Sequence, residues 1–205
     1  TTYVGFGQRE TMYMTVSSSL SAPYVAQSPK SQSNTSKKAK YVVTNEIWSF
    51  EQSTFSWTKI LLFGEHIKKR EESVAASFCH ENNTIIYVFG GKHHNRLFSD
   101  LIKIDISQQS ISIVQTTGNT PPPMTGSFMS YYNNKLYVWG GCVNLTDNIM
   151  NQTLYVYDIQ SNRWNSKLIE NIPGRCNASS VTIDGKMYIY GGLKDETSLL
   201  IIDLN

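Results

Sequence analysis

The sequence has few of the residues that build metal centres, disulfide frameworks or membrane spans. Its three cysteines, Cys79, Cys142 and Cys176, lie far apart and form no C-x-x-C pair. This argues against both a disulfide framework and a thiolate zinc site. No uninterrupted apolar run reaches the length of roughly 18 residues that a transmembrane helix needs. The sequence therefore predicts no membrane span.

Charge of one sign is also scarce. Eighteen Lys and Arg against sixteen Asp and Glu leave a net charge of +2 over 205 residues, which is too small to indicate nucleic-acid binding. With 40% apolar and 12% aromatic residues, the chain has enough material for the core of one globular domain. It has no initiator methionine and no apolar signal region. We therefore expect a cytoplasmic protein of which this chain is one piece.

What the chain does have is a repeat. Three segments of bulky residues run into a pair of glycines: Ile86–Gly91, Leu136–Gly141 and Met187–Gly192. The pairs begin at positions 90, 140 and 191, so the intervals are 50 and 51 residues. Self-similarity at this period is typical of a propeller or another repeat architecture.

Each glycine pair ends a strand of a predicted four-stranded antiparallel unit. Asn133-Asn134 and Asp184-Gly185 precede two of these strands as two-residue hairpin turns. After the glycines come a polar loop, a third strand and a fourth. In two units an aromatic residue of the third strand is followed seven positions later by tryptophan: Phe50 by Trp57, and Tyr157 by Trp164.

These features resemble the kelch family, whose blades combine a hydrophobic strand ending in Gly-Gly, a polar loop, a tyrosine-containing strand and a later tryptophan. The resemblance covers Glu46–Asn205 and implies an all-β fold, a kelch-type β-propeller of four-stranded antiparallel blades that forms an incomplete ring. Kelch blades often carry Pro-Arg before their first strand; Pro173 and Arg175 keep both residues, whereas Met124 follows three prolines without an arginine. The residues expected to maintain the repeat are Gly90, Gly91, Gly140, Gly141, Gly191, Gly192, Trp57 and Trp164.

The sequence suggests three regions. Residues 1–8 are interpreted as a degenerate second strand of a first blade, and residues 46–205 as the recognisable blades. Residues 9–45 are interpreted as an inserted loop before the third strand. From Ser17 to Lys40 this loop is rich in Ser and Lys and has no acidic residue. Such a composition buries too little apolar area to offset its ordering entropy, so we expect it to be largely disordered.

Antiparallel strands place the loops of a blade alternately on two faces. The turns between strands one and two, and between three and four, are short. The loops after the glycines and between blades are long, and long loops on a rigid scaffold often bind partners. Positive charge gathers in them, which favours a protein partner with an acidic or phosphorylated segment; the alternative is ordinary solvated loop charge, diluted by nearby acidic residues. The candidate partner-binding residues are Lys68, Lys69, Arg70, Lys92, His93, His94, Arg96, Asn144, Asp147, Arg175 and Lys194.

No candidate catalytic, cofactor-binding or metal-ligating set is apparent. A galactose-oxidase-like copper site needs converging histidines, and the chain has only His66, His80, His93 and His94, with His80 expected on the opposite face. The leading hypothesis is a non-enzymatic interaction scaffold or adaptor, because the resemblance implies propellers of this kind in ubiquitin-ligase adaptors and in actin-associated and trafficking proteins. An alternative is a regulatory propeller fused to a catalytic domain such as a phosphatase.

Overall fold

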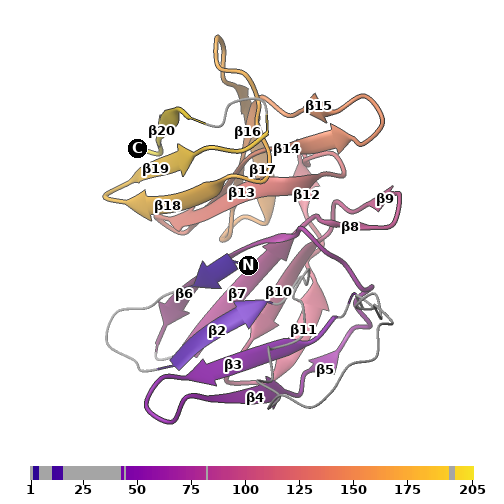
Figure 1. Ribbon diagram of the computed structural model, residues 1–205. Coiled ribbons are helices and arrows are strands. Elements are labelled where there is room, and N and C mark those ends of the chain that lie inside the picture. Colours follow the sequence, from indigo (N-terminus) through magenta and orange to yellow (C-terminus); the bar gives the residue numbers. More distant parts are fainter. Residues whose placement is uncertain (1, 5–10, 16–42, 44, 82, 194–196) are drawn as a thin grey trace, which may run out of the picture.

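The computed structural model describes residues 2–4, 11–15, 43, 45–81, 83–193 and 197–205, and these residues form strands, turns and loops. The strands make four mainly antiparallel sheets and one small hairpin (Figure 1). No stretch within the described residues forms a helix with the length and hydrophobicity needed to cross a membrane. We number the four sheets as blades 1 to 4 in chain order.

Blade 1 has the strand order β1-β2-β3-β4, from the centre of the molecule outward. Its strands are β1 (Thr2–Val4), β2 (Thr11–Thr15), β3 (Ile47–Glu51) and β4 (Ser56–Ile60). The start of the chain therefore differs from the expected arrangement. Residues 2–4 are the first strand of the blade, and residues 11–15, which the sequence predicts to lie in the inserted loop, are the second.

The physical reason is strand pairing. β2 pairs with β1 on one side and with β3 on the other, so both edges of its backbone are hydrogen-bonded. The Ser- and Lys-rich composition begins only at Ser17, so it does not describe Thr11–Thr15. Residues 5–10, 16–42 and 44 lie outside the described residues, so disorder in the remaining insertion stays a prediction.

Blades 2 and 3 each have four main strands and a short fifth one at the outer edge. Blade 2 contains β6 (Val74–His80), β7 (Asn83–Phe89), β10 (Leu101–Asp105), β11 (Ser110–Ile113) and the outer β5 (Phe63–Gly64). Blade 3 contains β13 (Thr125–Tyr132), β14 (Lys135–Asn144), β16 (Thr153–Asp158), β17 (Arg163–Leu168) and the outer β12 (Thr117–Gly118), while β15 (Ile149–Met150) pairs with the end of β14. The outer strands β5 and β12 are parallel to their neighbours, unlike the rest of each sheet.

Blade 4 has three strands: β18 (Ser179–Ile183), β19 (Lys186–Tyr190) and β20 (Leu199–Asp203). The small hairpin pairs β8 (Lys92–His93) with β9 (Arg96–Leu97) in the loop after the first glycine pair. The innermost strands of successive blades contact one another in the order β1, β6, β13, β18. The blades are therefore arranged side by side around a common centre, as in part of a propeller ring (Figure 1).

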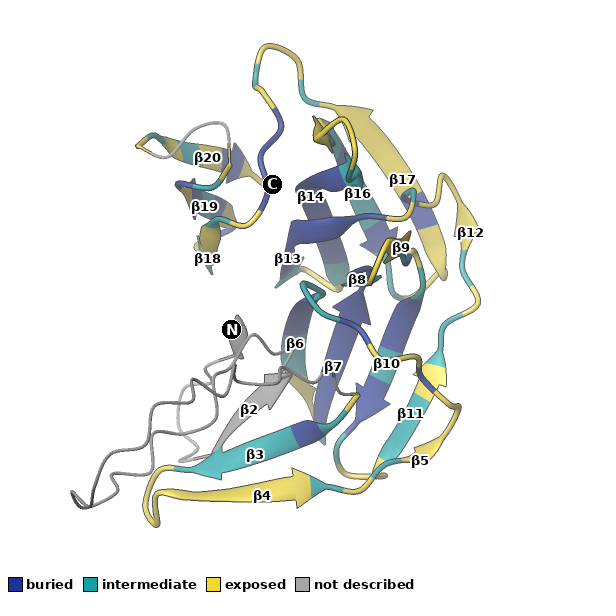
Figure 2. Cartoon of the chain, turned by 45° about the vertical axis from the view of Figure 1, so that its right-hand side comes forward, coloured by how far each residue is buried: buried dark blue, intermediate teal, exposed yellow. Residues whose placement is uncertain are grey.

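The core lies between the blades, because alternate residues of each strand point toward opposite neighbours. On β7, Ile86 and Val88 join a cluster with Ile47 of blade 1, whereas Tyr87 and Phe89 join a cluster with Trp164 of blade 3. A third cluster forms between blades 3 and 4. The second strands of blades 2 and 3, β7 and β14, are accordingly buried on both faces along most of their length (Figure 2).

The repeated glycines fill the role predicted for them, which is close backbone approach at the end of a strand. All six have positive φ, between 65° and 96°. A Cβ atom on Gly90 would lie 2.6 Å from the carbonyl oxygen of Met124, and one on Gly140 would lie 2.5 Å from that of Arg175. Each clash involves the connection that leads into the next blade. The glycine pairs thus allow one blade to dock closely on the following one.

Candidate protein-interaction face

The antiparallel pairing divides the loops between two faces of the molecule, as the sequence predicted. We call the face with the longer loops the long-loop face. It comprises the connections 61–73, 114–124 and 169–178 and the loops 90–100, 140–152 and 191–198, of which residues 194–196 are not described. Hydrogen bonds join these segments: the amide of Gly91 donates to the carbonyl of Met124, and the amide of Met124 donates to the carbonyl of Phe98. The face is therefore a continuous surface rather than a set of separate loops.

Arg70 belongs to this face by sequence, but its side chain points inward. It is only 7% exposed, and its two terminal nitrogens donate to the two carboxylate oxygens of Asp100 at 2.6 and 2.7 Å. The same guanidinium donates to the carbonyl of Gly90 at 3.0 Å and lies 4.3 Å from the centre of the Phe98 ring. Such a bidentate pair fixes geometry well. Arg70 ties its connection to the loop of blade 2, which corrects its assignment to partner binding.

Arg175 has the equivalent structural role in blade 4. It is 3% exposed and donates to the carbonyl and hydroxyl oxygens of Ser198 at 3.1 and 2.9 Å. Because the Arg175 side chain is buried and bound within the chain, its assignment to partner binding is also corrected. In blade 3 the equivalent position is Met124, as the strand register shows. In each blade, the residue just before the glycine pair is paired with a residue of the innermost strand. Arg70, Met124 and Arg175 each lie four positions before that innermost-strand residue.

Three more of the predicted residues are engaged within the chain. The Lys92 ammonium lies 2.6 Å from a carboxylate oxygen of Glu72, whose other oxygen accepts a hydrogen bond from the Thr125 hydroxyl. The Asn144 side-chain oxygen accepts bonds from the amides of Thr146 and Asp147, and its amide donates to the Asp147 carboxylate at 2.9 Å. These contacts hold the loops in shape, so the polar groups of Lys92, Asn144 and Asp147 have fewer hydrogen-bonding positions left for a partner.

His93 and His94 lie in the β8–β9 hairpin, with ring centres 4.3 Å apart. Among the described residues, no group of three His, Cys, Asp or Glu side chains gathers as metal ligands. Lys69 is exposed on the connection between blades 1 and 2, and Lys194 lies outside the described residues. The histidine pair is thus part of a surface hairpin that also carries Arg96.

Arg96 takes part in a basic pocket that the sequence did not reveal as a unit. This outer basic pocket has a volume of about 360 Å³ and lies against blade 2 on the long-loop face. Its lining includes His66, Lys68, Arg96, Phe98, Asp100 and Pro123. Of the predicted binding residues, the structure brings Lys68 and Arg96 together here. His66 was missed as a member, because nothing in its sequence neighbourhood links it to the distant Arg96.

The charge balance of the outer basic pocket is positive. Its carboxylate, Asp100, is already paired with Arg70. Among the described residues, no acidic group lies within ion-pairing distance of Lys68 or Arg96. Arg96 lies over the Phe98 ring, with its guanidinium carbon 5.7 Å from the ring centre. The ring packs against one face of the guanidinium and leaves the N–H donors along its edge free to bind an anionic group.

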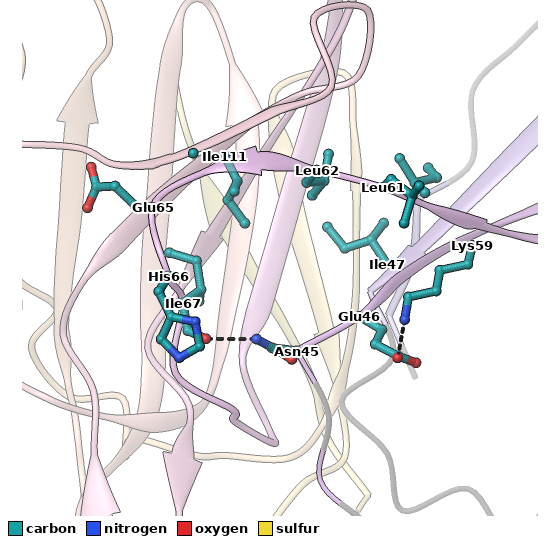
Figure 3. Close-up of a pocket in the computed structure, with 12 residues that line it drawn as sticks. Asn45, Glu46, Ile47, Lys59, Leu61, Leu62, Glu65, His66, Ile67 and Ile111 are labelled. Carbon is teal, nitrogen blue, oxygen red and sulfur yellow. Dashed lines mark hydrogen bonds and ion pairs between the residues drawn. The ribbon is translucent and has the colours of Figure 1, made fainter.

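A second cavity, which we call the inter-blade pocket, lies between blades 1 and 2 (Figure 3). Its volume is about 370 Å³, and its lining includes Asn45, Glu46, Ile47, Lys59, Ile67 and Ile111. His66 lines both pockets. The Lys59 ammonium pairs with the Glu46 carboxylate, and this hydrogen bond lowers the pKa of Glu46. This cavity was also absent from the sequence prediction, because it forms only where the two blades meet.

The geometry defines a β-propeller protein whose longer loops lie on one face. Residues 33–204 match the KLHDC2/KLHL20/DRC7 Kelch-repeats domain, and the chain therefore belongs to this family of kelch-repeat proteins. The structure resembles the solved structure of YjhT, with a TM-score of 0.62, 18% identity and coverage of 78% of this chain and 56% of that one. At this identity the likeness concerns the fold alone.

Curated relatives align over shorter stretches. Human Kelch domain-containing protein 1 is 41% identical over 71 residues, which is 31% of this chain and 17% of the human protein. Tip elongation aberrant protein 3 of Schizosaccharomyces pombe is 27% identical over 129 residues, 59% of this chain and 12% of the yeast protein. The chain thus spans a small part of the length of these relatives.

Proposed function

We propose that this chain is the non-enzymatic interaction domain of an adaptor protein, and that its long-loop face binds a partner segment carrying acidic or phosphorylated side chains. The observation that supports the proposal is the outer basic pocket. His66, Lys68 and Arg96 converge there from two separate loops, beside a carboxylate that Arg70 already neutralises. Kelch-repeat membership makes a protein the expected kind of partner.

The chemistry of the pocket suits an anionic group. A carboxylate or phosphate accepts charge-assisted hydrogen bonds from guanidinium and ammonium groups, and these are stronger than neutral ones. Lys68 and Arg96 are exposed in the unbound state. An anionic partner would replace their hydration with direct contacts, and the attraction between opposite charges would raise the rate of association. Arg70 and Lys92 have partners within the chain, and the proposal therefore rests on the remaining cations.

The experiment is a peptide array probed with the intact protein. Each peptide containing Asp, Glu or phosphoserine is matched with a version in which that residue is Asn, Gln or Ser. We expect preferential binding of the anionic versions and its loss in the variant Lys68→Glu/Arg96→Glu. Lys167→Glu on β17 is the control, because Lys167 is exposed and lies outside both pockets. Equal binding of matched peptides, or equal loss in the control, would overturn the proposal.

A further inference from the structure

We infer that the anionic group bound in the outer basic pocket is a phosphate monoester, such as phosphoserine, rather than a carboxylate, and that the Ser99 hydroxyl donates a hydrogen bond to it. The inference rests on the proposed function of this pocket and narrows the partner to a phosphorylated segment. It also gives Ser99, which no sequence pattern singled out, a role in choosing between two kinds of anion.

The positive charge of the outer basic pocket matches a phosphate better than a carboxylate. Lys68 and Arg96 line it and have no acidic partner among the described residues. The Asp100 charge is already offset by Arg70, and Glu65 lines the inter-blade pocket instead. A phosphoserine carries about −1.5 to −2 charges at neutral pH, whereas a glutamate carries a single one. A carboxylate would therefore leave about half of the pocket's charge unbalanced.

Ser99 adds a neutral donor to the two cations. It lines the pocket and is exposed, and none of the described residues accepts a hydrogen bond from its hydroxyl. A phosphate monoester presents three strong acceptor oxygens, so the Lys68 ammonium, the Arg96 guanidinium and the Ser99 hydroxyl would each bond a different oxygen. A carboxylate has two oxygens in one plane. A phosphate therefore uses more of the donors in the pocket.

The buried Arg70 side chain joins the two sides of the pocket. It donates to the carbonyl of Lys68 at 3.2 Å and to the carbonyl of Gly90 at 3.0 Å. It also binds both carboxylate oxygens of Asp100, the residue that follows Ser99. The backbone that carries Lys68 and Ser99 is therefore held in place before a ligand binds. Such preorganisation lowers the entropic cost of binding.

The test uses a synthetic peptide library with a fixed central phosphoserine and random flanking residues, passed over the immobilised intact protein. The best-retained phosphoserine peptide is then titrated beside two matched peptides, in which phosphoserine is replaced by Glu or by Ser. We expect the phosphoserine peptide to bind about tenfold more tightly than the Glu version, because it gains a charge-assisted hydrogen bond. The Ser version should bind more weakly than either.

Variants of the protein then locate the phosphate. Ser99→Ala should weaken the phosphoserine peptide about threefold to tenfold and change binding of the Glu version less than about twofold, because the removed bond is made to the phosphate alone. Ser107→Ala is the matched control, because Ser107 is another exposed serine of blade 2 that lines neither pocket. The variant Lys68→Glu/Arg96→Glu should remove the preference for phosphoserine.

The outcomes separate the two levels of the proposal. Equal affinity for the phosphoserine and Glu peptides, or a phosphoserine affinity that Ser99→Ala leaves unchanged, would overturn this inference and leave the proposed function standing. Equal affinity for all three peptides would overturn both. A phosphoserine preference that persists in Lys68→Glu/Arg96→Glu would also overturn both, because the anion would then bind outside the pocket. Melting curves of each variant show whether a loss of binding reflects loss of the fold.

Discussion

Trp57 and Trp164 occupy the same position in two blades and have different surroundings. Each pairs across the sheet with an aromatic residue seven positions earlier, Phe50 and Tyr157 respectively. Trp164 is 1% exposed and lies 5.9 Å from Phe89 of blade 2, measured between ring centres. Trp57 is 47% exposed, because among the described residues no blade precedes blade 1. The comparison shows that burial in this fold comes from the neighbouring blade.

The other end of the chain shows the same effect. In blade 3 the face that points away from blade 2 is covered by blade 4, and Trp139 and Tyr137 are buried there. The corresponding face of blade 4 has no neighbour among the described residues, and five of its large apolar side chains are at least half exposed. They are Val181, Ile183, Tyr190, Leu199 and Ile201. A contiguous apolar surface of this kind favours association.

The largest expected effect tests the tryptophan comparison directly. Trp164→Ala should lower the free energy of unfolding by about 3–5 kcal/mol, because it opens a cavity in the core between blades 2 and 3. Trp57→Ala should cost about 1 kcal/mol, because much of that ring is already in water. Urea denaturation of both variants measures the difference.

Equal losses at the two positions would contradict the conclusion that the neighbouring blade buries the tryptophan. The same measurement in a longer form of the protein tests this conclusion further. If further chain covers blade 1, the cost of Trp57→Ala should rise toward that of Trp164→Ala, while the cost at Trp164 stays the same.

The second test concerns a contact that needs no neighbouring blade. Arg70 and Asp100 both belong to blade 2 and its connection, and Arg70→Met should cost about 3 kcal/mol because it leaves the Asp100 carboxylate without its partner. Blade 3 has Met124 and, by continuing the β14–β16 register, Thr153 at these two positions. The double variant Arg70→Met/Asp100→Thr should therefore recover most of the loss.

Denaturant unfolding of the two single variants and the double variant gives the coupling between the sites. If the double variant is no more stable than Arg70→Met, blade 3 does not supply a substitute for the ion pair. In that case stability within a blade would depend on position in the ring, as stability between blades does.

The smallest expected effect is on pH dependence. Burial between blades 2 and 3, with smaller contributions from Tyr87 and Asp158, raises the pKa of Tyr157 to about 12. A raised pKa means that the folded state holds this proton more tightly than the unfolded state, whose tyrosine has a pKa near 10. The contribution is therefore fully present below pH 10 and is lost between about pH 10 and 12, at no more than about 1.4 kcal/mol per pH unit.

Tyr157→Phe cannot ionise, and stability curves of this variant should fall less steeply than those of the unmodified protein across that pH window. The variant also loses the 2.6 Å hydrogen bond to the Asn162 side-chain oxygen, so its stability at neutral pH is the reference for the comparison. An unchanged slope above pH 10 would show that Tyr157 is not shielded by the neighbouring blade.

Much of the fold was predictable because it repeats. The glycine pairs and the hairpin turns located blades 2 to 4, and the aromatic residues seven positions before Trp57 and Trp164 located the last two strands of blades 1 and 3. The kelch-type propeller was confirmed. The second strand of blade 1 was not predicted, because Thr11–Thr15 adjoins a Ser- and Lys-rich stretch and has no glycine pair after it. The outer strands β5 and β12 have two residues each, which is too short for any periodic pattern.

The candidate site was less predictable. Net charge in the long loops indicated a basic face, but charge alone does not tell whether a side chain turns inward. Arg70 and Arg175 turn inward because the loop carbonyls, Asp100 and Ser198 offer them acceptors. His66 and Arg96 come together only through the packing of two connections on blade 2.

The sequence by itself determined the blade and its period. Strand alternation, turn residues and glycines with positive φ act over a few neighbouring positions, so they can be read from the chain directly. Tertiary structure alone decided which equivalent residues are buried and which cations remain available to a partner. Both depend on what packs against a residue from another blade or loop, as the exposed Trp57 and the buried Trp164 show.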